Sequence, residues 1–182
     1  MKPYLLVLHN LLRFGCLKLK SRQTTFSRVE LLSRNSKLVF HKNSRVTFGD
    51  RVVTDGRFVV ITDDQAVLTI GDRVYFNEDA MISCKGSVTI GSGCKFGPNV
   101  KIFDNNHKFD AENGVSEAHS VGTVTIGERT WIGANCVILK GASIGKNCVI
   151  GAGCVVSGEI PDGSIVTEGR GLTVRPIQKR GD

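Results

Sequence analysis

The stretch IGERTWIGANCVILKGASIGKNCVIGAGCVVSGEIP, residues 126–161, determines the fold class. An aliphatic residue occurs at every sixth position: Ile126, Ile132, Ile138, Ile144, Ile150 and Val156. This period fits neither an α-helix, with about 3.6 residues per turn, nor a strand, whose side chains alternate with a period of about two. It predicts a chain wound into a triangular coil, in which each hexad forms one short side and its corner and the repeated aliphatic side chain points inward.

The other hexad positions refine this prediction. The fifth position is also expected inside, and it holds Thr130, Cys136, Ala142, Cys148, Cys154 and Ile160. Glycine follows the repeated aliphatic in four hexads, where we expect it to relieve backbone strain near a corner. Four of the six cysteines, counting Cys94, occupy the fifth position. They are therefore expected to be small buried thiols in a reducing compartment rather than disulfide partners.

A tripeptide marks the successive turns of the coil. Thr-x-Gly begins at residues 47, 69, 89 and 125, and Ser143-Ile-Gly follows. The intervals are 22, 20, 36 and 18 residues, and 18 residues correspond to three hexads. The interval of 36 loses the pattern between Asp104 and Gly122, in a polar stretch with two histidines. We interpret this stretch as a long loop that leaves the coil, and such loops often carry function.

Composition and charge are consistent with one soluble domain of 182 residues. No apolar run approaches the roughly 18 residues of a membrane span, and no signal peptide is evident. Residues 1–51 carry eleven Lys or Arg against two acids, and leucines at nearly helical spacing in residues 4–20 predict a short basic amphipathic helix. Three roles for it remain open: a cap on the coil, a contact with a membrane surface, or a grip on an anionic glycan or lipid-linked substrate. Nucleic-acid binding is not expected, because the basic region lacks interleaved aromatic residues.

Two segments resemble a known family. Residues 130–161 and FGPNVKIFDNNH, residues 96–107, are similar to hexapeptide-repeat acyltransferases, in particular the galactoside, maltose and surface-polysaccharide O-acetyltransferases. The resemblance covers roughly residues 46–169. It implies an all-β, left-handed parallel β-helix that forms a cytoplasmic homotrimer, with active sites between neighbouring prisms. The expected organisation is a basic cap (1–37), a β-helix domain (38–169) with an extruded catalytic loop (104–122), and a basic tail (170–182).

The same resemblance implies direct acetyl transfer from acetyl-CoA to a carbohydrate hydroxyl. His107 matches the family's general base, and a histidine suits this role because its pKa lies near neutral pH. Asn77, Asp79 and Asp104 are expected near the acceptor; Asp104 and Asp110 also flank His107 and are candidates for orienting it, as is a backbone carbonyl. His119 lies in the same loop without a motif match, and no role is expected for it.

Donor binding is expected to rest largely on backbone amides. The matching positions are Ala134 and Ala152, and the outward-facing Trp131 is expected to flank the pantetheine arm. The family's closing segment is replaced here by GRGLTVR, residues 169–175. Arginine binds phosphate well, so the expected phosphate contacts are Arg170, Arg175, Lys179 and Arg180.

Other functions remain as alternatives. Serine, an amino sugar or an antibiotic are alternative acceptors to a capsular, lipopolysaccharide or exopolysaccharide glycan. A non-catalytic scaffold is the alternative outside enzymes. No metal is expected, because the four histidines lack the spacing that a zinc site requires. A cysteine nucleophile is disfavoured, because only Cys84 lies off the pattern in the matched region and no base accompanies it.

Overall fold

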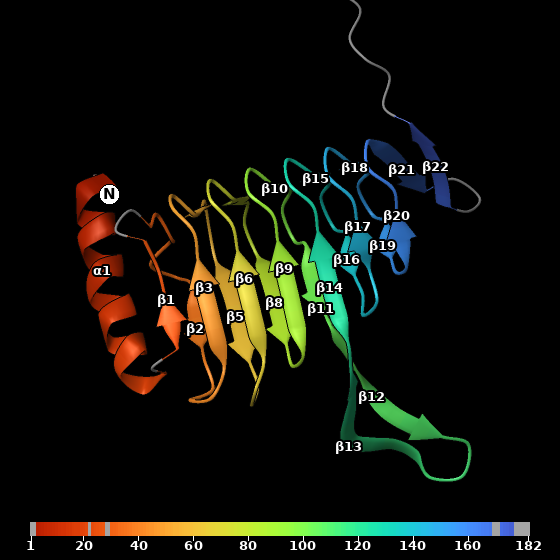
Figure 1. Cartoon of the computed structure of the whole chain (residues 1–182), viewed down its shortest axis with the longest axis horizontal. Helices are drawn as coiled ribbons and strands as arrows, with labels where there is room; N and C mark the ends of the chain where they lie inside the picture. The colour runs from red at the N-terminus through yellow and green to blue at the C-terminus, as the bar shows by residue number, and fades with distance from the viewer. Residues whose placement is uncertain (1–2, 22, 28–29, 169–171, 177–182) are drawn as a thin grey trace, which may run out of the picture.

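The chain forms a β-solenoid with one helix across its first coil (Figure 1). The computed structural model describes residues 3–21, 23–27, 30–168 and 172–176. Three sheets form the three faces of the prism. Within each face the strands of successive coils pair in parallel, except that the two C-terminal strands of one face pair antiparallel. We call the faces A, B and C, and the chain visits A, then B, then C in each complete coil.

Each face is a stack of short strands. Face A contains β1 (Thr24–Thr25), β3 (Arg45–Phe48), β6 (Val67–Ile70), β9 (Ser87–Ile90), β14 (Thr123–Ile126), β17 (Ser143–Ile144) and β20 (Glu159–Ile160). Face B contains β4 (Val53–Thr54), β7 (Tyr75–Phe76), β10 (Lys95–Phe96), β15 (Trp131–Ile132), β18 (Val149–Ile150), β21 (Ser164–Glu168) and β22 (Leu172–Pro176). Face C contains β2 (Lys37–Val39), β5 (Phe58–Thr62), β8 (Ala80–Cys84), β11 (Lys101–Phe103), β16 (Val137–Ile138) and β19 (Val155–Val156).

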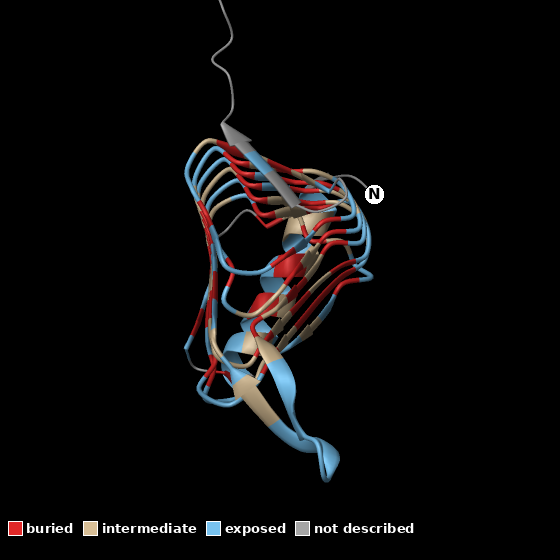
Figure 2. Cartoon of the chain, turned by 90° about the vertical axis from the view of Figure 1, so that its right-hand side faces the viewer, coloured by how far each residue is buried: buried red, intermediate tan, exposed pale blue. Residues whose placement is uncertain are grey.

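The hexad pattern places its aliphatic and fifth-position side chains inside the prism, as predicted (Figure 2). All six repeated aliphatics of residues 126–156 are at most 1% exposed, and the fifth-position residues are at most 6% exposed. In register across coils, Ile126 stands beside Ile90 on one side and Ile144 on the other. Earlier coils use larger side chains, and the rings of Phe76 and Phe96 stack at 4.5 Å between centroids.

The glycines after the repeated aliphatics serve a different purpose from the one expected. Gly127 and Gly133 are not among the residues with positive φ. A Cβ on Gly127 would lie 2.4 Å from the Lys146 nitrogen, and one on Gly133 would lie 2.6 Å from the Ala152 nitrogen. These glycines therefore permit close stacking of consecutive coils. The left-handed backbone falls on nearby turn residues, including Asn135, Gly141 and Asn147.

Helix α1 (Pro3–Lys20) lies across the open end of the first coil (Figure 1). Its Phe14 is fully buried and stacks on Phe26 at 4.7 Å, so the predicted basic helix acts as a cap. Strand β1 lies within the segment assigned to the cap and pairs with β3 of the next coil, so the solenoid begins before the predicted residue 38. Among the described helical residues, none forms a segment of the length and apolarity needed to span a bilayer.

The interruption of the hexad pattern is an ordered β-hairpin rather than an irregular loop. Strands β12 (Asn105–Asp110) and β13 (Gly114–Val121) pair antiparallel and project from the corner between faces C and A (Figures 1 and 2). We call residues 105–121 the hairpin. The predicted basic tail also contains ordered structure, because β22 pairs antiparallel with β21.

Candidate active site

His107 lies on the first strand of the hairpin, and its imidazole is held from one side. Its Nδ1 is 3.0 Å from the carbonyl oxygen of Ser116 on the opposite strand. A carbonyl accepts hydrogen bonds only, so this contact favours the tautomer with the proton on Nδ1. That tautomer leaves Nε2 as a hydrogen-bond acceptor. The residue is exposed, so the ring is oriented by the protein while it remains open to a substrate.

His119 is the cross-strand partner of His107. The two residues are paired in the hairpin register, and their ring centroids are 4.1 Å apart. Cross-strand neighbours on one face of an antiparallel pair restrict each other's side-chain positions. His119 therefore contributes to the surroundings of His107, a role that sequence analysis did not assign to it.

Asp104 fastens the base of the hairpin. It is fully buried, and its carboxylate oxygens accept the backbone amides of Lys85 and Gly86, each at 2.8 Å. The side-chain amide of Asn105 donates a third hydrogen bond at 2.9 Å. The sequence suggested an acceptor contact or an orienting contact to His107. The structure instead places Asp104 inside the coil, with its donors supplied by the β8–β9 turn and by its neighbour.

The remaining polar contacts of the hairpin lie at its tip and its second strand. The carboxylate of Asp110 accepts the amides of Glu112 and Asn113, and these hydrogen bonds hold its pKa below the usual value. Lys140 on the neighbouring coil donates to the hydroxyl of Ser120 at 2.6 Å. Of the three orienting groups suggested for His107, the recorded contact is thus a backbone carbonyl, that of Ser116.

The corner between faces B and C carries a column of small residues. Backbone amides bond each coil to the next along this column, from Asn77 to Phe96, from Gly97 to Ile132, and from Gly133 to Ile150. Ala134 and Ala152 follow Gly133 and Gly151 at the same corner of consecutive coils. In the part of the chain that the structure describes, neither alanine amide donates to a backbone carbonyl. Among the described residues, these two N–H groups are therefore candidate donors to a ligand.

The expected acceptor residues Asn77 and Asp79 lie at the same corner, on an earlier coil. Asn77 is half-buried, and its side-chain oxygen accepts the amide of Glu78 at 2.7 Å. Asp79 is exposed and adopts a φ of 56°, and its carbonyl accepts Lys101 Nζ at 2.6 Å. The side-chain amide nitrogen of Asn77 and the carboxylate of Asp79 are therefore polar groups on the rim of the column.

Trp131 stands at the start of β15 on face B. Its Cα pairs in register with Lys95 and Val149, and 54% of the residue is exposed. An indole with this exposure presents a flat apolar surface and one donor to a ligand or another chain. Trp131 lies three residues before Ala134, at the end of face B that adjoins the corner between faces B and C.

Within a single chain, His107 does not lie beside Trp131 and Ala134. The hairpin leaves the corner between faces C and A, whereas Trp131 lies on face B and Ala134 at the corner between B and C. Phe109 and Val115 face each other near the hairpin tip and are 76% and 73% exposed. An exposed apolar pair on a projecting hairpin is typical of a contact with another chain.

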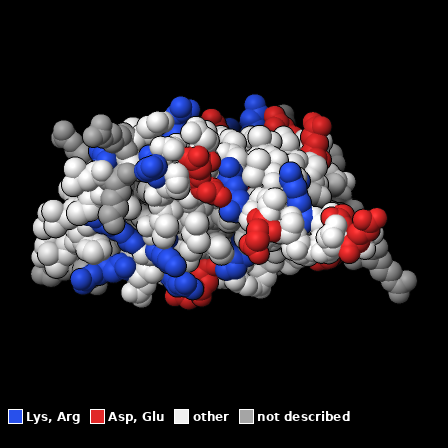
Figure 3. Space-filling view, turned by 90° about the horizontal axis from the view of Figure 1, so that it is seen from below, with Lys and Arg blue, Asp and Glu red and all other residues white. Residues whose placement is uncertain are grey.

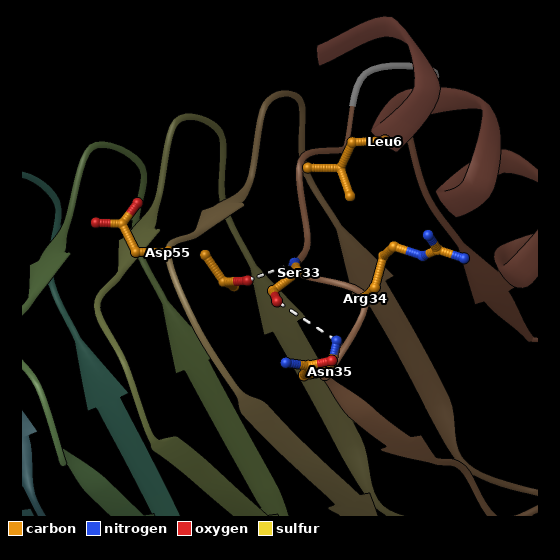
Figure 4. Close-up of a pocket in the computed structure, with 6 residues that line it drawn as sticks. Leu6, Ser33, Arg34, Asn35 and Asp55 are labelled. Carbon is orange, nitrogen blue, oxygen red and sulfur yellow. Dashed lines mark hydrogen bonds between the residues drawn. The ribbon is translucent and has the colours of Figure 1, made fainter. Parts of the chain in front are cut away.

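The described residues contain a hollow away from the hairpin. It has a volume of about 350 Å³ and lies between α1 and the first coils (Figure 4), lined by Leu6, Ser33, Arg34, Asn35, Thr54 and Asp55. His107 is not among its lining residues, so this hollow is not the candidate active site.

The structure places Cys84, the cysteine that lies off the hexad pattern, where its thiol is unsuited to act as a nucleophile. Cys84 is fully buried, and burial, with a smaller contribution from the Asp104 carboxylate, raises the pKa of its thiol. A buried neutral thiol is a poor nucleophile. No cluster of three or more His, Cys, Asp or Glu side chains suited to a metal occurs in the described ranges.

Of the residues expected to contact phosphate at the C-terminus, only Arg175 lies within the described ranges. Arg170, Lys179 and Arg180 lie outside the described residues. The backbone of Arg175 belongs to β22, where it pairs with Ile165.

A family model and known proteins match this architecture. Residues 123–158 match the model "Bacterial transferase hexapeptide (six repeats)". These repeats are similar to those of the bacterial transferase hexapeptide family. The match covers the last coils, and the structure extends the same winding back to β1.

Relatives of this hexapeptide-repeat chain include proteins named as O-acetyltransferases. Galactoside O-acetyltransferase of Escherichia coli K12 is 36% identical over 116 residues, which are 62% of this chain and 54% of the relative. The candidate lipopolysaccharide biosynthesis O-acetyltransferase WbbJ of Escherichia coli K12 is 27% identical over 163 residues, 78% of this chain and 82% of the relative. The chain spans little more than half the length of several other curated relatives.

Solved structures support the fold. A variant of AntD, an N-acyltransferase from Bacillus cereus studied with a dTDP-amino sugar and coenzyme A, matches with a TM-score of 0.71. The match covers 92% of this chain and 90% of AntD at 15% identity. At this identity the likeness concerns the coil architecture alone.

Proposed function

We propose that this protein is an O-acetyltransferase that moves an acetyl group from acetyl-CoA to a carbohydrate hydroxyl. The observation that carries the proposal is the exposed His107 imidazole, whose Nδ1 faces the Ser116 carbonyl at 3.0 Å. The relatives named as O-acetyltransferases support the reaction class. The finer role, acetylation of a capsular, lipopolysaccharide or exopolysaccharide glycan by a cytoplasmic enzyme near the inner membrane, belongs to the same proposal.

His107 serves as the general base. With the proton on Nδ1, Nε2 accepts the proton of the acceptor hydroxyl while the oxygen attacks the thioester carbonyl. The C–S bond then breaks, and the imidazolium returns its proton to the departing thiolate. The Ser116 carbonyl stabilises the imidazolium, because its contact with the Nδ1–H strengthens when the ring becomes charged. A direct ternary complex follows, because the buried Cys84 is unsuited to carry a covalent acetyl group.

The donor substrate fits the corner between faces B and C. The amides of Ala134 and Ala152 suit the carbonyls of an extended pantetheine arm, and the amide of Ala134 suits the developing oxyanion. The exposed Trp131 ring borders the same groove. Arg170, Arg175 and Lys179 remain the proposed contacts for the nucleotide phosphates. No residue in this scheme requires a metal.

Asn77 and Asp79 are proposed acceptor contacts on the earlier coil, since an amide and a carboxylate both bind sugar hydroxyls. For Asp104 we propose positioning instead of substrate contact, because its carboxylate is buried beneath the hairpin. The site is completed by a second copy in a homotrimer. Support comes from the separate corners that hold His107 and Trp131, and from the exposed apolar hairpin tip.

The test is release of free thiol from acetyl-CoA, measured across a panel of sugar acceptors. His107→Ala is expected to lower kcat by about 10² to 10⁴-fold with little change in the unfolding midpoint. His41→Ala is the matched control, because His41 occupies the same corner between faces C and A on an early coil and pairs with Asp64. Wild-type turnover by His107→Ala would remove the base assignment.

Other acceptors and a non-enzymatic role define the remaining outcomes. Serine, amino-sugar and antibiotic acceptors belong in the same panel, and turnover with one of these alone would replace the carbohydrate assignment. A scaffold would show neither thiol release nor acetyl-CoA binding by calorimetry.

A further inference from the structure

We propose that the outward face of α1 binds the surface of an anionic lipid bilayer. This face, the α1 outer face, comprises five large apolar side chains that are each at least 45% exposed: Tyr4, Leu5, Leu8, Leu12 and Leu19. Single exposed leucines are ordinary on protein surfaces, but a continuous apolar stripe along a helix requires a covering partner. The contact uses the side of α1 that points away from the coil and does not depend on acetyl transfer.

The stripe follows from the helical spacing. At about 100° per residue, the five side chains fall within an arc of about 100°. Asn10 and Phe14, which are buried, lie on the opposite side of the helix. One face of α1 thus packs on the first coil, and an equally apolar face points away from it.

The helix cannot turn this stripe inward. The side-chain amide of Asn10 donates to the carbonyls of Glu30, at 3.2 Å, and Leu32, at 2.9 Å. Arg13 donates to the carbonyls of Ser33 and Ser36. These polar contacts fix the rotation of α1 about its own axis, so the leucines remain on the outside.

Electrostatics favours anionic lipid as the occupant. Helix α1 contains no acidic residue, and residues 1–51 carry a net charge of +9 while the rest of the chain carries −2. On the side seen in Figure 3, the end of the molecule that bears α1 displays Lys and Arg without Asp or Glu. Lys18 on α1 and Lys37 and Lys42 on the first coil are exposed at this end. Apolar side chains bordered by cations are the pattern of helices that lie in a membrane interface.

A second copy of this chain is a poorer occupant. Contact between two α1 outer faces would bring two ends of net charge +9 together, and close like charges repel. A bilayer containing acidic lipids instead matches both the apolar stripe and the charge. The helix is about 27 Å long and lies across the end of the solenoid (Figure 1), so its whole length can lie parallel to a membrane plane.

Sedimentation of the full chain with lipid vesicles tests the proposal. We expect binding to phosphatidylcholine vesicles that contain phosphatidylglycerol, and at least about tenfold weaker binding to phosphatidylcholine alone. The double variant Leu8→Gln/Leu12→Gln is expected to weaken binding at least about tenfold, because glutamine keeps helix propensity while removing the apolar surface. Vesicles should also slow the reaction of the exposed Cys16 thiol with a water-soluble reagent.

Val155→Gln is the matched control, since Val155 is a 48% exposed apolar residue on β19, far along the solenoid. It should bind vesicles like wild type, and the unfolding midpoints of both variants should match wild type. Absence of binding to anionic vesicles, or equal binding by the α1 double variant, would refute the proposal. Self-association that the double variant abolishes, without vesicle binding, would identify the face as a contact between copies.

Discussion

The buried carboxylate of Asp104 gives the sharpest prediction about how the coil supports the hairpin. Asp104→Asn keeps one oxygen as an acceptor but presents an NH₂ group to the second of two backbone amides. One partly buried N–H, that of Lys85 or Gly86, then loses its partner. An unsatisfied buried donor costs about 1–3 kcal/mol, so we expect the free energy of unfolding to fall by about 2 kcal/mol. Asp104→Ala, which removes both acceptors, should cost about 4 kcal/mol by the same reasoning.

Urea denaturation followed by the fluorescence of Trp131, the single tryptophan, measures this loss. Hydrogen exchange at the amides of Lys85 and Gly86 locates it, since both should exchange faster in the variants. If positioning of His107 depends on this anchor, Asp104→Asn should also lower kcat while leaving KM for acetyl-CoA nearly unchanged. Asp110→Asn at the exposed hairpin tip is the control and should change the unfolding midpoint much less. Unchanged exchange at both amides in Asp104→Asn would refute the reasoning.

Three further outcomes follow from packing and titration. Gly133→Ala should lower the free energy of unfolding, measured by urea denaturation, by about 2 kcal/mol, because its Cβ would meet the next coil's backbone at 2.6 Å. The control Gly15→Ala, in open space on α1, should be neutral or stabilise the protein by about 0.5 kcal/mol. Burial raises the pKa of Glu30 to about 8, so folding opposes its ionisation; stability should fall as pH rises from about 5 to 8, and Glu30→Gln should flatten this dependence. Native protein should show one fast-reacting thiol, that of Cys16, and Cys16→Ser should abolish it, whereas several fast thiols would contradict the buried cysteine positions.

The period of six was sufficient to predict the solenoid because every hexad carries the same pattern of inward-facing positions. Ile126, Ile132 and Ile138 each end the strand on one side of the prism, so a deviation in one hexad does not change the prediction for the others. The prediction that glycine relieves corner strain was wrong for Gly127 and Gly133. Their constraint comes from the next coil, 18 or more residues away, and the local sequence does not display it.

The hairpin was missed although its signal was present. Asn113-Gly114 is a favoured hairpin turn, and Phe109 and Val115 on either side carry the apolar residues of a cross-strand pair. In the structure Gly114 pairs with Asp110 directly after the loop of residues 111–113, and it adopts a positive φ of 69° there. Regular pairing outward from Asp110 and Gly114 would place Glu117 opposite His107; a register shift between His107 and Phe109 brings His119 there instead. The polar composition of the segment favoured an irregular loop instead, because its strands lack a buried face.

The sequence could not predict that Asp104 lies inside the coil, for a different reason. A carboxylate beside a candidate base is compatible with substrate contact, with orientation of the base, and with structural anchoring. Only the fold shows that the β8–β9 turn supplies two amides at the same point. Spacing along the chain does not encode which backbone donors an earlier turn presents to Asp104.

The separation of His107 from Trp131 leads to a prediction about assembly. If each site combines the hairpin of one copy with face B of its neighbour, two inactive variants should complement each other. Mixed assemblies of His107→Ala and Trp131→Ala contain sites that draw an intact histidine from one variant and an intact tryptophan from the other. With random mixing of equal amounts, about a quarter of the sites are restored.

Co-refolding the two variants and assaying thiol release measures this recovery, at an acetyl-CoA concentration where the Trp131→Ala assembly alone is inactive. Each variant refolded alone is the control, and size-exclusion chromatography of differently tagged chains verifies that mixed assemblies form. Recovery of about a quarter of wild-type activity supports a site shared between copies. Mixed assemblies without activity would show that His107 and Trp131 act within one chain, which would contradict the placement of the donor groove at a corner that the hairpin of the same chain does not reach.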